Sequence, residues 1–485
     1  MLDKRLRQCA EFVSGKGIVV DVGTDHALLP VELVKSGKCS KVFATDINEK
    51  PLESAKKNIE KNNLFPEIET ILSDGLEEVS LEGVTDIVIA GMGGETIAEI
   101  IGEMNCDNTQ NIRFILQPMT KIDYLRKMIY EYEMQIVAEK AVQDGDKIYT
   151  VMWVENNSDF KYLTEYESIA GFFEPDDETG KLYRQKEAER LERVADSLKK
   201  AGKESESVHY SALAFKLKNG VKYESVKDIY NYLDTLYPFS TQEKWDNSGL
   251  LVNTGKECEK VVLSLDITNR VISKAGCMGA ELIISHHPVI FHPIKNISFS
   301  SPVYALIENE ISAICMHTNL DKAKNGTNGV ILQKLKEKFS ISKEPEIFED
   351  TGDGLGFGWI VELDEIITGR KLAESLKEIF GCEYIRITDK GSHYAMKRIS
   401  FCSGSGGSMI EIAKEKNCQA LITGDVKHDI WIDSNNSGGR PVIFDCGHFH
   451  TENLVLWELR RVLEEKFPQL DIEISDRSTD PCEYV

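Results

Sequence analysis

The stretch IVVDVGTDH at residues 18–26 decides the fold of the first half of the chain. Its apolar run is short and ends at Asp21 and Gly23, which is typical of a buried strand followed by a tight turn. Four more apolar runs follow, separated by sequence rich in Glu, Lys and Ala: KVFATDI (41–47), ETILSDG (69–75), TDIVIAGMGG (85–94) and IRFILQP (112–118). This alternation predicts an α/β domain over residues 1–154, with a parallel sheet covered by helices on both faces.

Acidic and glycine residues follow the predicted strands, at the sheet edge where open α/β folds bind ligands. Asp46 lies 25 positions after Asp21, a spacing suited to ribose hydroxyls, and Asp74 follows the third strand within reach of an adenine amino group. The glycines after the fourth strand let the backbone approach a sulfonium group. The pattern therefore favours S-adenosylmethionine, with a predicted site at Asp21, Gly23, Asp46, Asp74, Gly75, Gly91, Met92, Gly93 and Gly94.

A nicotinamide dehydrogenase is the competing interpretation of this half. It requires a G-x-G-x-x-G turn after the first strand. The sequence instead has Thr24, Asp25 and His26 directly after Gly23, which disfavours that interpretation.

A polar segment at 155–221 separates the two halves and predicts a helical arm. Leu191, Val194, Ala195 and Leu198 have the spacing of an amphipathic helix. Residues 181–203 contain eight basic and four acidic side chains, although the whole chain carries a net charge of −23. Two interpretations stay open: a positive arm that binds nucleic acid, or a solvated helix held by salt bridges.

At DVGTDHALLP (21–30), AGMGG (90–94) and ILQP (115–118) the chain resembles the TrmK family of bacterial tRNA adenine-N1 methyltransferases. The resemblance implies a Rossmann-like class I methyltransferase domain, tRNA as the partner of this domain and of the arm, and the donor pocket predicted above. It also implies that Asp25 stands near the target base. N1 of adenine carries a lone pair and needs no deprotonation, so a carboxylate there would stabilise the cationic product.

Two features depart from the family pattern. The segment after Asp46 reads INEKP, where a glycine is more usual before the proline, and Met119 stands where asparagine is usual. An N-terminal half that binds RNA or donor without turnover is therefore the alternative.

The second half, from residue 222, predicts another α/β domain with histidines at three strand ends. SHHP (285–288) supplies His286 and His287, HTNLD (317–321) supplies His317 and Asp321, and the segment GHFHTE (447–452) supplies further imidazoles and a carboxylate. Imidazole and carboxylate together suit divalent zinc, manganese, iron or nickel. We expect a helix that begins near Thr451 and turns Glu452 toward His448.

WDNSGLLV (245–252), SHHPVIF (285–291), HTNLD and GHFHTE together resemble the dinuclear-metal-centre proteins of the Nif (NGG-interacting-factor) class, also called GTP cyclohydrolase I type 2. The resemblance implies a ring-shaped homohexamer with two metal ions per chain. The ligands that it implies are His286, His287, Asp321, His448 and Glu452, with Glu452 bridging both ions. His317, His428 and His450 are expected around them.

Two activities remain open for the second half. A pair of ions supports hydrolysis of a phosphate-containing substrate, with SGSGGS (403–408) as a phosphate cradle or simply a tight turn. The alternative is a non-catalytic oligomeric scaffold.

The chain shows no sign of a membrane segment or a secretory signal. It has no apolar run of about 18 residues, and MLDKRLRQCAEFV at the N-terminus lacks a cleavable apolar stretch. Its eleven cysteines are scattered and contain no CxxC pair, which predicts free thiols. We expect a cytoplasmic protein.

Overall fold

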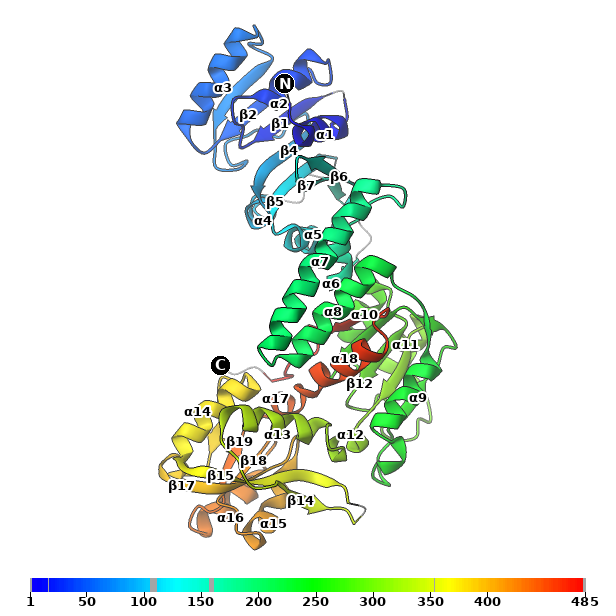
Figure 1. Cartoon of the computed structure of the whole chain (residues 1–485), viewed down its shortest axis with the longest axis vertical. Coiled ribbons are helices and arrows are strands. Elements are labelled where there is room, and N and C mark those ends of the chain that lie inside the picture. Colours follow the sequence, from blue (N-terminus) through cyan, green and yellow to red (C-terminus); the bar gives the residue numbers. More distant parts are fainter. Residues whose placement is uncertain (1, 16, 105–110, 157–160, 353, 483–485) are drawn as a thin grey trace. The chain divides into compact units, whose positions relative to one another are not determined.

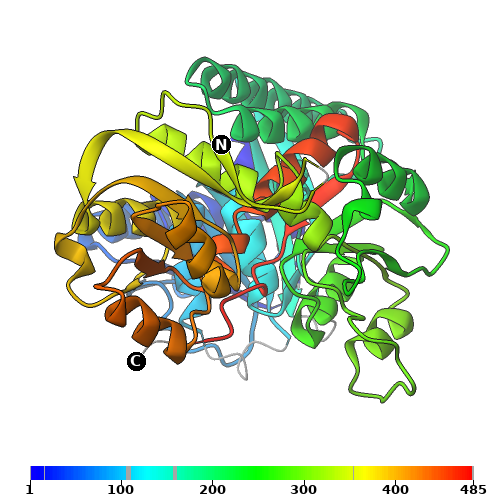
Figure 2. The ribbon, with the colours of Figure 1, turned by 90° about the horizontal axis from the view of Figure 1, so that it is seen from below.

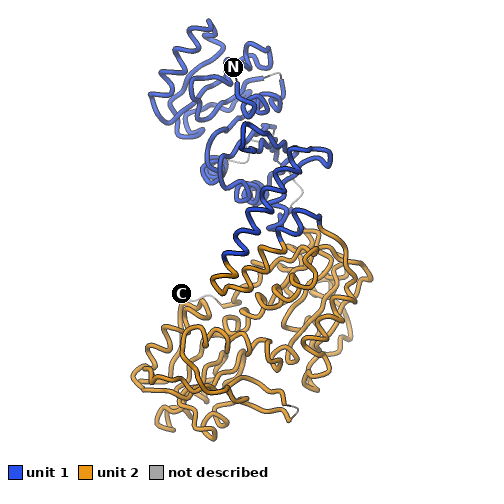
Figure 3. The backbone as a smooth tube through the Cα atoms, in the orientation of Figure 1, with its two compact units in different colours: residues 1–197, 213–220 blue, residues 198–212, 221–485 orange. Residues whose placement is uncertain are grey.

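The structure is a computed structural model that describes residues 2–15, 17–104, 111–156, 161–352 and 354–482. Two compact units make up the chain (Figure 3): residues 1–197 with 213–220, and residues 198–212 with 221–485. Within the described ranges, no helix is long and apolar enough to cross a membrane.

The first unit is built on a seven-stranded sheet of order β3-β2-β1-β4-β5-β7-β6 (Figure 1). The strands are β1 (Ile18–Val22), β2 (Lys41–Asp46), β3 (Ile68–Leu72), β4 (Val84–Gly93), β5 (Arg113–Thr120), β6 (Met134–Asp144) and β7 (Lys147–Asn156). All five predicted strands are present and parallel to one another.

The expectation of a purely parallel sheet was wrong at one edge. There β6 and β7 pair antiparallel with each other, and β7 pairs antiparallel with β5. Only Gly145 and Asp146 separate β6 from β7, and a connection that short can join antiparallel strands alone.

Helices cover both faces of this sheet, as predicted. They are α1 (Lys4–Phe12), α2 (Leu28–Lys35), α3 (Glu49–Lys61), α4 (Gly94–Gly102) and α5 (Ile122–Glu131). Successive residues of β1 point to opposite faces: Val19 packs in an apolar cluster with α1, α2 and α3, and Val20 packs in another with α4 and α5.

The helical arm consists of α6 (Glu165–Ala170), α7 (Glu178–Lys200) and α8 (Glu204–Asn219). A fully buried ion pair fastens α6 to the sheet domain: Arg126 Nη2 lies 2.6 Å from Glu139 Oε1. Arg126 Nη1 also donates to the carbonyl oxygens of Ser168 and Ile169, at 2.6 and 3.2 Å. Glu139 Oε2 accepts from the Phe172 N–H, so this pair organises the start of the arm.

Most basic side chains of α7 already have protein partners. Lys181 pairs with Glu178 and Arg190 with Glu187, while Arg184 and Lys186 donate to backbone carbonyls. Arg193, Lys199 and Lys200 are exposed as well, and for them the described residues provide no such partner. The positive charge available to a polyanion is therefore smaller than the composition suggests.

The second unit contains two larger sheets, of order β20-β11-β12-β13-β9 and β14-β15-β17-β18-β19-β16. The first is formed by β9 (Gly249–Val252), β11 (Lys260–Ser264), β12 (Leu282–Ser285), β13 (Ser312–Cys315) and β20 (Asp471–Ile474). The second is formed by β14 (Glu346–Asp350), β15 (Gly356–Thr368), β16 (Arg386–Ile387), β17 (Ala395–Phe401), β18 (Ala420–Thr423) and β19 (Val442–Asp445). In Figure 2, β15 is the long curved yellow strand. A two-stranded ribbon joins β8 (Glu224–Ser225) to β10 (Glu257–Cys258).

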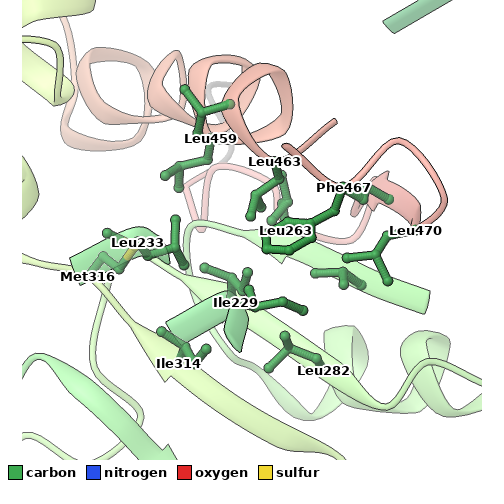
Figure 4. Packing of buried hydrophobic residues seen from close by; sticks show 14 of the residues in the cluster. Ile229, Leu233, Leu263, Leu282, Ile314, Met316, Leu459, Leu463, Phe467 and Leu470 are labelled. Atoms are coloured by element: carbon green, nitrogen blue, oxygen red, sulfur yellow. The ribbon is translucent and has the colours of Figure 1, made fainter. Parts of the chain in front are cut away.

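One face of the five-stranded sheet packs against α9 (Val226–Leu236) and α18 (Val455–Lys466). Figure 4 shows Ile229 from α9 and Leu459 from α18 in one cluster with Leu263 and Leu282 of the strands. All four side chains are buried, and burial of each such side chain stabilises the fold by about 1.5–3 kcal/mol. This core fixes the strand ends that carry His286 and His287.

The remaining helices of this unit are shorter on average and flank both sheets. They are α10 (Asn269–Met278), α11 (Pro302–Glu308), α12 (Thr318–Lys322), α13 (Thr327–Lys338), α14 (Gly369–Phe380), α15 (Ile410–Glu415), α16 (His428–Asn436) and α17 (His448–Glu452).

Candidate functional sites

The predicted donor-site residues of the first unit share one sheet edge. Strands β3, β2, β1 and β4 are neighbours in that order, so their carboxyl ends form a row. Backbone bonds tie the loops of the row together: the Thr24 N–H donates to the Thr45 carbonyl at 2.8 Å, and the Ser73 N–H donates to the Asp46 carbonyl at 3.1 Å. The strand order changes direction between β1 and β4, which is where open α/β sheets form their binding crevice.

Three carboxylates stand at this edge in different environments. Asp21 is buried, and burial raises its pKa to about 7 although a hydrogen bond from Thr24 opposes the rise. Asp46 is half-buried and accepts a hydrogen bond from the Asn48 N–H at 2.8 Å. Asp74 is exposed. Asp46 and Asp74 can therefore meet a ligand from solvent, whereas Asp21 lies behind them.

The glycine loop after β4 packs against the turn after β1. Gly23 has φ +74°, and a Cβ there would lie 2.1 Å from Met92 Cε. Gly91 has φ +85°, and its N–H donates to Gln117 Oε1 at 3.1 Å. A side chain at Gly94 would meet the Lys121 carbonyl oxygen at 2.3 Å. Close approach of the backbone therefore requires glycine at position 94, and the positive φ angles favour glycine at positions 23 and 91.

Sequence reasoning missed two polar side chains beside this loop, Arg5 and Gln117. Arg5 Nη1 donates to Gln117 Oε1 at 2.6 Å and approaches Met119 Sδ at 3.4 Å. Gln117 is buried and links the cation of α1 to the Gly91 backbone. Gln117 lies in the ILQP run, but nothing local links Arg5 to the site, because Gln117 and Met119 are more than 110 residues away from it. Met119 thus contacts a cation of the candidate site.

Asp25 projects from the turn that follows β1. Its side chain is 78% exposed and its Oδ1 lies 3.3 Å from His26 Nε2. His26 and Ala27 both have positive φ, at 57° and 48°, so the turn is sharp and leads directly into α2. The carboxylate is free to face a large ligand at the strand ends.

In the second unit, five side chains from distant parts of the sequence converge. Glu452 Oε2 lies 3.1 Å from His287 Nε2, 3.0 Å from His448 Nε2 and 3.8 Å from His286 Nε2. Asp321 Oδ1 lies 3.6 Å from His286 Nε2. These separations suit shared ions, since two donor atoms each about 2.1 Å from one ion are at most about 4.2 Å apart.

Three polar atoms of this cluster are buried and, among the described residues, have no hydrogen-bond partner: His286 Nε2, Asp321 Oδ1 and Glu452 Oε2. The short contacts of Glu452 lack the alignment of hydrogen bonds. Leaving such groups unsatisfied costs about 1–3 kcal/mol each, and more when they are charged. The donor set and its orphaned atoms therefore fit divalent cations.

Each converging imidazole points Nε2 toward Glu452 and is held in place by a hydrogen bond at Nδ1. Nδ1 of His286 bonds the Met316 carbonyl oxygen, at 2.8 Å. Nδ1 of His287 bonds Asp266 Oδ1 and Nδ1 of His448 bonds Asp425 Oδ2, both also at 2.8 Å. Sequence reasoning missed these two carboxylates, although both directly follow predicted strands, in VVLSLDI (261–267) and LITGD (421–425).

The charges of the cluster are strongly coupled. Burial would raise the pKa of Glu452, but the imidazoles hold it well below its usual range. Burial would lower the pKa of His287, but Asp266 and Glu452 raise it to about 10. The pKa of His448 likewise rises to about 9 through Glu452 and Asp425, against the effect of burial. Without a metal ion, protons on these imidazoles balance the carboxylates.

Local geometry differs from the expectation at two places. The helix expected to begin near Thr451 is two: α17 carries His448 and Glu452 one turn apart, and α18 begins at Val455. In the SGSGGS loop, the N–H groups of Ser403, Gly404 and Gly406 donate to side chains of Asn328, Thr451 and Thr423. A Cβ at Gly404 would lie 2.1 Å from Glu452 Oε1, so this loop supports Glu452 as a tight turn.

The three additional histidines have different surroundings. His317 lies with His286 and His287. His450 Nε2 instead lies 3.5 Å from Asp480 Oδ2, and His428 is exposed at the start of α16.

The fold and the sites thus define two classes of protein in one chain. The first unit is a methyltransferase-type α/β domain, and the second unit carries a candidate dinuclear metal centre. Comparison with known families agrees. Residues 224–481 match the family described as Duf34/NIF3 (NGG1p interacting factor 3), and residues 2–152 match the family described as methyltransferase domain. The chain belongs to the Duf34/NIF3 family and carries an N-terminal methyltransferase domain, which confirms both resemblances.

Individual relatives match one half each. A "GTP cyclohydrolase 1 type 2 homolog" of Clostridium perfringens is 30% identical over 269 residues, 54% of this chain and 99% of that protein. The "tRNA (adenine(22)-N(1))-methyltransferase" of Bacillus subtilis is 34% identical over 154 residues, 32% of this chain and 65% of that protein. A crystal structure of a putative tRNA (m1A22) methyltransferase from Streptococcus pneumoniae shares 34% identity, with 45% of this chain and all of that chain covered, at a TM-score of 0.41.

Proposed function

We propose that the first unit is an S-adenosylmethionine-dependent tRNA adenine-N1 methyltransferase. The match of residues 2–152 to the methyltransferase domain supports this, as does the relative that acts on adenine 22 of tRNA. The observation that carries it is the shared edge of β3, β2, β1 and β4, where Asp46 and Asp74 stand at neighbouring strand ends. Bound S-adenosylmethionine supplies an electrophilic methyl group on a sulfonium.

In this proposal Asp46 accepts hydrogen bonds from ribose hydroxyls and Asp74 from the adenine amino group. The turn at Gly23 and the loop at Gly91–Gly94 admit the donor close to the backbone. Asp25 stabilises the positive charge that develops on the adenine ring after N1 attacks. The exposed cations of α7 contact phosphates of the RNA, and the target base leaves its stack to reach the site.

Substitution of Asp25 with alanine is expected to lower kcat/KM for methylation of unmodified tRNA by roughly tenfold, with donor affinity unchanged. The factor is modest because an exposed carboxylate acts through solvent-screened charge. Steady-state methylation with labelled donor, and calorimetric titration of the donor, measure the two quantities. Asp144→Ala, an exposed aspartate on β6, is the matched control. Full activity of Asp25→Ala would remove the role given to this residue.

We further propose that the second unit holds two divalent ions, one between His286, Asp321 and Glu452 and one between His287, His448 and Glu452. The orphaned buried atoms of these residues carry the proposal. Such a pair supplies a water nucleophile at neutral pH and stabilises charge on substrate oxygens. Asp266 and Asp425 hold the imidazoles in place, and the packing of Gly404 against Glu452 excludes water from behind the centre.

Hydrolysis of a phosphate-containing substrate is the activity proposed for this centre, within a homohexamer. The alternative is an oligomeric scaffold without catalysis. Hydrolysis of generic phosphoesters that rises in proportion to bound metal supports the enzyme; full metal occupancy without hydrolysis of any phosphoester supports the scaffold. Sedimentation of the full chain measures the assembly.

Metal affinity is expected to rise with pH between about 6 and 9. The metal-free imidazoles of His287 and His448 have pKa values near 10 and 9, so below those values protons compete with the ions. Each binding event must then release protons. Calorimetric titration with zinc in buffers of different ionisation enthalpy counts them. An affinity that does not change over this pH range would contradict the prediction.

A further inference from the structure

A shared hydrogen-bonding pattern marks the imidazoles of the proposed centre. His286, His287 and His448 each use Nδ1 to bond a protein oxygen at 2.8 Å and turn Nε2 toward the cluster. Metal-ligating histidines in proteins almost always hold their second ring nitrogen in this way, because the bond fixes both the tautomer and the ring. The pattern is therefore a criterion for further ligands.

His317 meets the same criterion. Its Nδ1 lies 2.8 Å from Asp246 Oδ1, and Asp246 Oδ2 accepts from the Thr318 N–H and hydroxyl at 3.0 and 2.5 Å. A carboxylate oxygen accepts hydrogen bonds, so this contact places the ring proton of His317 on Nδ1 and leaves Nε2 as the outward donor of electrons.

The WDNSG segment (245–249) holds His317 through two hydrogen bonds. Besides the ring contact with Asp246, the His317 N–H donates to Ser248 Oγ at 3.0 Å. The His317 ring is four-fifths buried, and its centroid lies 5.2 Å from that of His286 and 5.6 Å from that of His287. One nitrogen from each of these three rings falls within 4.8 Å of the other two.

We infer that His317 is a further metal ligand, donating Nε2 to the ion beside His286. The inference rests on the proposed dinuclear centre. His287 is already committed by its contacts with His448 and Glu452, at 3.3 and 3.1 Å, so the ion beside His286 is the one that His317 reaches.

The two ions then differ in their protein ligands. With His317, the ion beside His286 has one protein donor more than the other ion. The ion at His287, His448 and Glu452 keeps three and retains an open position for water or substrate oxygen. The structure thus assigns a supporting role to the first ion and substrate contact to the second.

Titration of the metal-free full chain with Co²⁺, followed by calorimetry and visible absorption, tests this inference. We expect the unsubstituted protein to bind two ions and His317→Ala to bind one of them at least about tenfold more weakly, with loss of the intense absorption of tetrahedral Co²⁺. The other ion keeps its affinity. His393→Ala, an exposed histidine of the same unit, serves as the matched control.

The outcomes separate the two claims. Two ions bound with unchanged affinities and spectrum in His317→Ala overturn the role of His317 and leave the metal centre standing. Equal weakening of both ions overturns its assignment to a single ion. An unsubstituted protein that binds no Co²⁺ overturns the centre and this inference together. Asp246→Asn, which keeps the shape of the site, gives a second test with the same expected direction should the alanine variant fail to fold.

Discussion

Substitution of Glu452 with glutamine is expected to abolish binding of both metal ions at micromolar metal. One oxygen of this buried carboxylate lies within 3.8 Å of three imidazole nitrogens, so it is the only proposed ligand that both ion positions share. The neutral amide keeps the shape of the side chain but removes the negative charge that offsets two divalent cations. Because loss of a supporting contact alone typically costs 10–100-fold in metal affinity, we expect a loss of at least about 100-fold for each ion.

Metal analysis of the variant after dialysis against a metal buffer measures this loss. Glu411→Gln is the control, because Glu411 is an exposed glutamate of the same unit that pairs with Lys414. Circular dichroism and the thermal midpoint of the metal-free proteins establish that both variants fold. If Glu452→Gln retains two ions per chain, Glu452 does not bridge them.

Substitution of Arg126 with methionine is expected to destabilise the first unit by about 3–5 kcal/mol. Arg126 and Glu139 have fully buried side chains, and removal of one partner leaves an uncompensated charge in the interior. The carbonyl oxygens of Ser168 and Ile169 lose their donor as well. The start of the helical arm therefore loosens together with the edge strand β6.

Hydrogen exchange of the full chain, read on peptides of β6 and α6, measures this effect. Peptides from β12 in the second unit serve as the internal reference. Arg190→Met, at an exposed pair with Glu187, should change protection by less than about 0.5 kcal/mol. The double variant Arg126→Met, Glu139→Leu should recover much of the loss, since it removes both charges. Unchanged protection in Arg126→Met would show that the pair does not organise the arm.

Local sequence patterns predicted the strands that carry the sites. Short apolar runs that end in Asp, Gly or His identify β1, β2, β4 and β12. The apolar run and the residue that ends it are neighbours in the sequence, so the signal for each strand is local. The hairpin of β6 and β7 escaped prediction although Asp144 and Gly145 mark its turn; its strands mix charged and apolar residues, so no apolar run announces them. Pairing of β7 with β5 follows from tertiary packing alone.

Strand polarity accounts for only part of the metal cluster. His286 and Asp321 follow β12 and β13, which are parallel neighbours in the five-stranded sheet, whereas Glu452 follows β19 of the six-stranded sheet. The meeting of the two sheets could not be predicted. The carboxylates that orient the imidazoles are 21 to 71 residues away from them in sequence. Many aspartates follow strands, and only the fold selects Asp266, Asp425 and Asp246 as partners. In the first unit, Arg5 and Gln117 form a hydrogen bond although they are 112 residues apart in sequence.

The central claim is that the second unit binds a pair of divalent ions, and its most direct test is the metal content of the full chain. The protein is purified without added metal, then equilibrated with zinc or manganese and freed of unbound ions. Elemental analysis should give two ions per chain at neutral pH, both lost when strong acidification protonates the imidazoles and carboxylates that bind them. A chain that retains no divalent ion under these conditions would contradict the account.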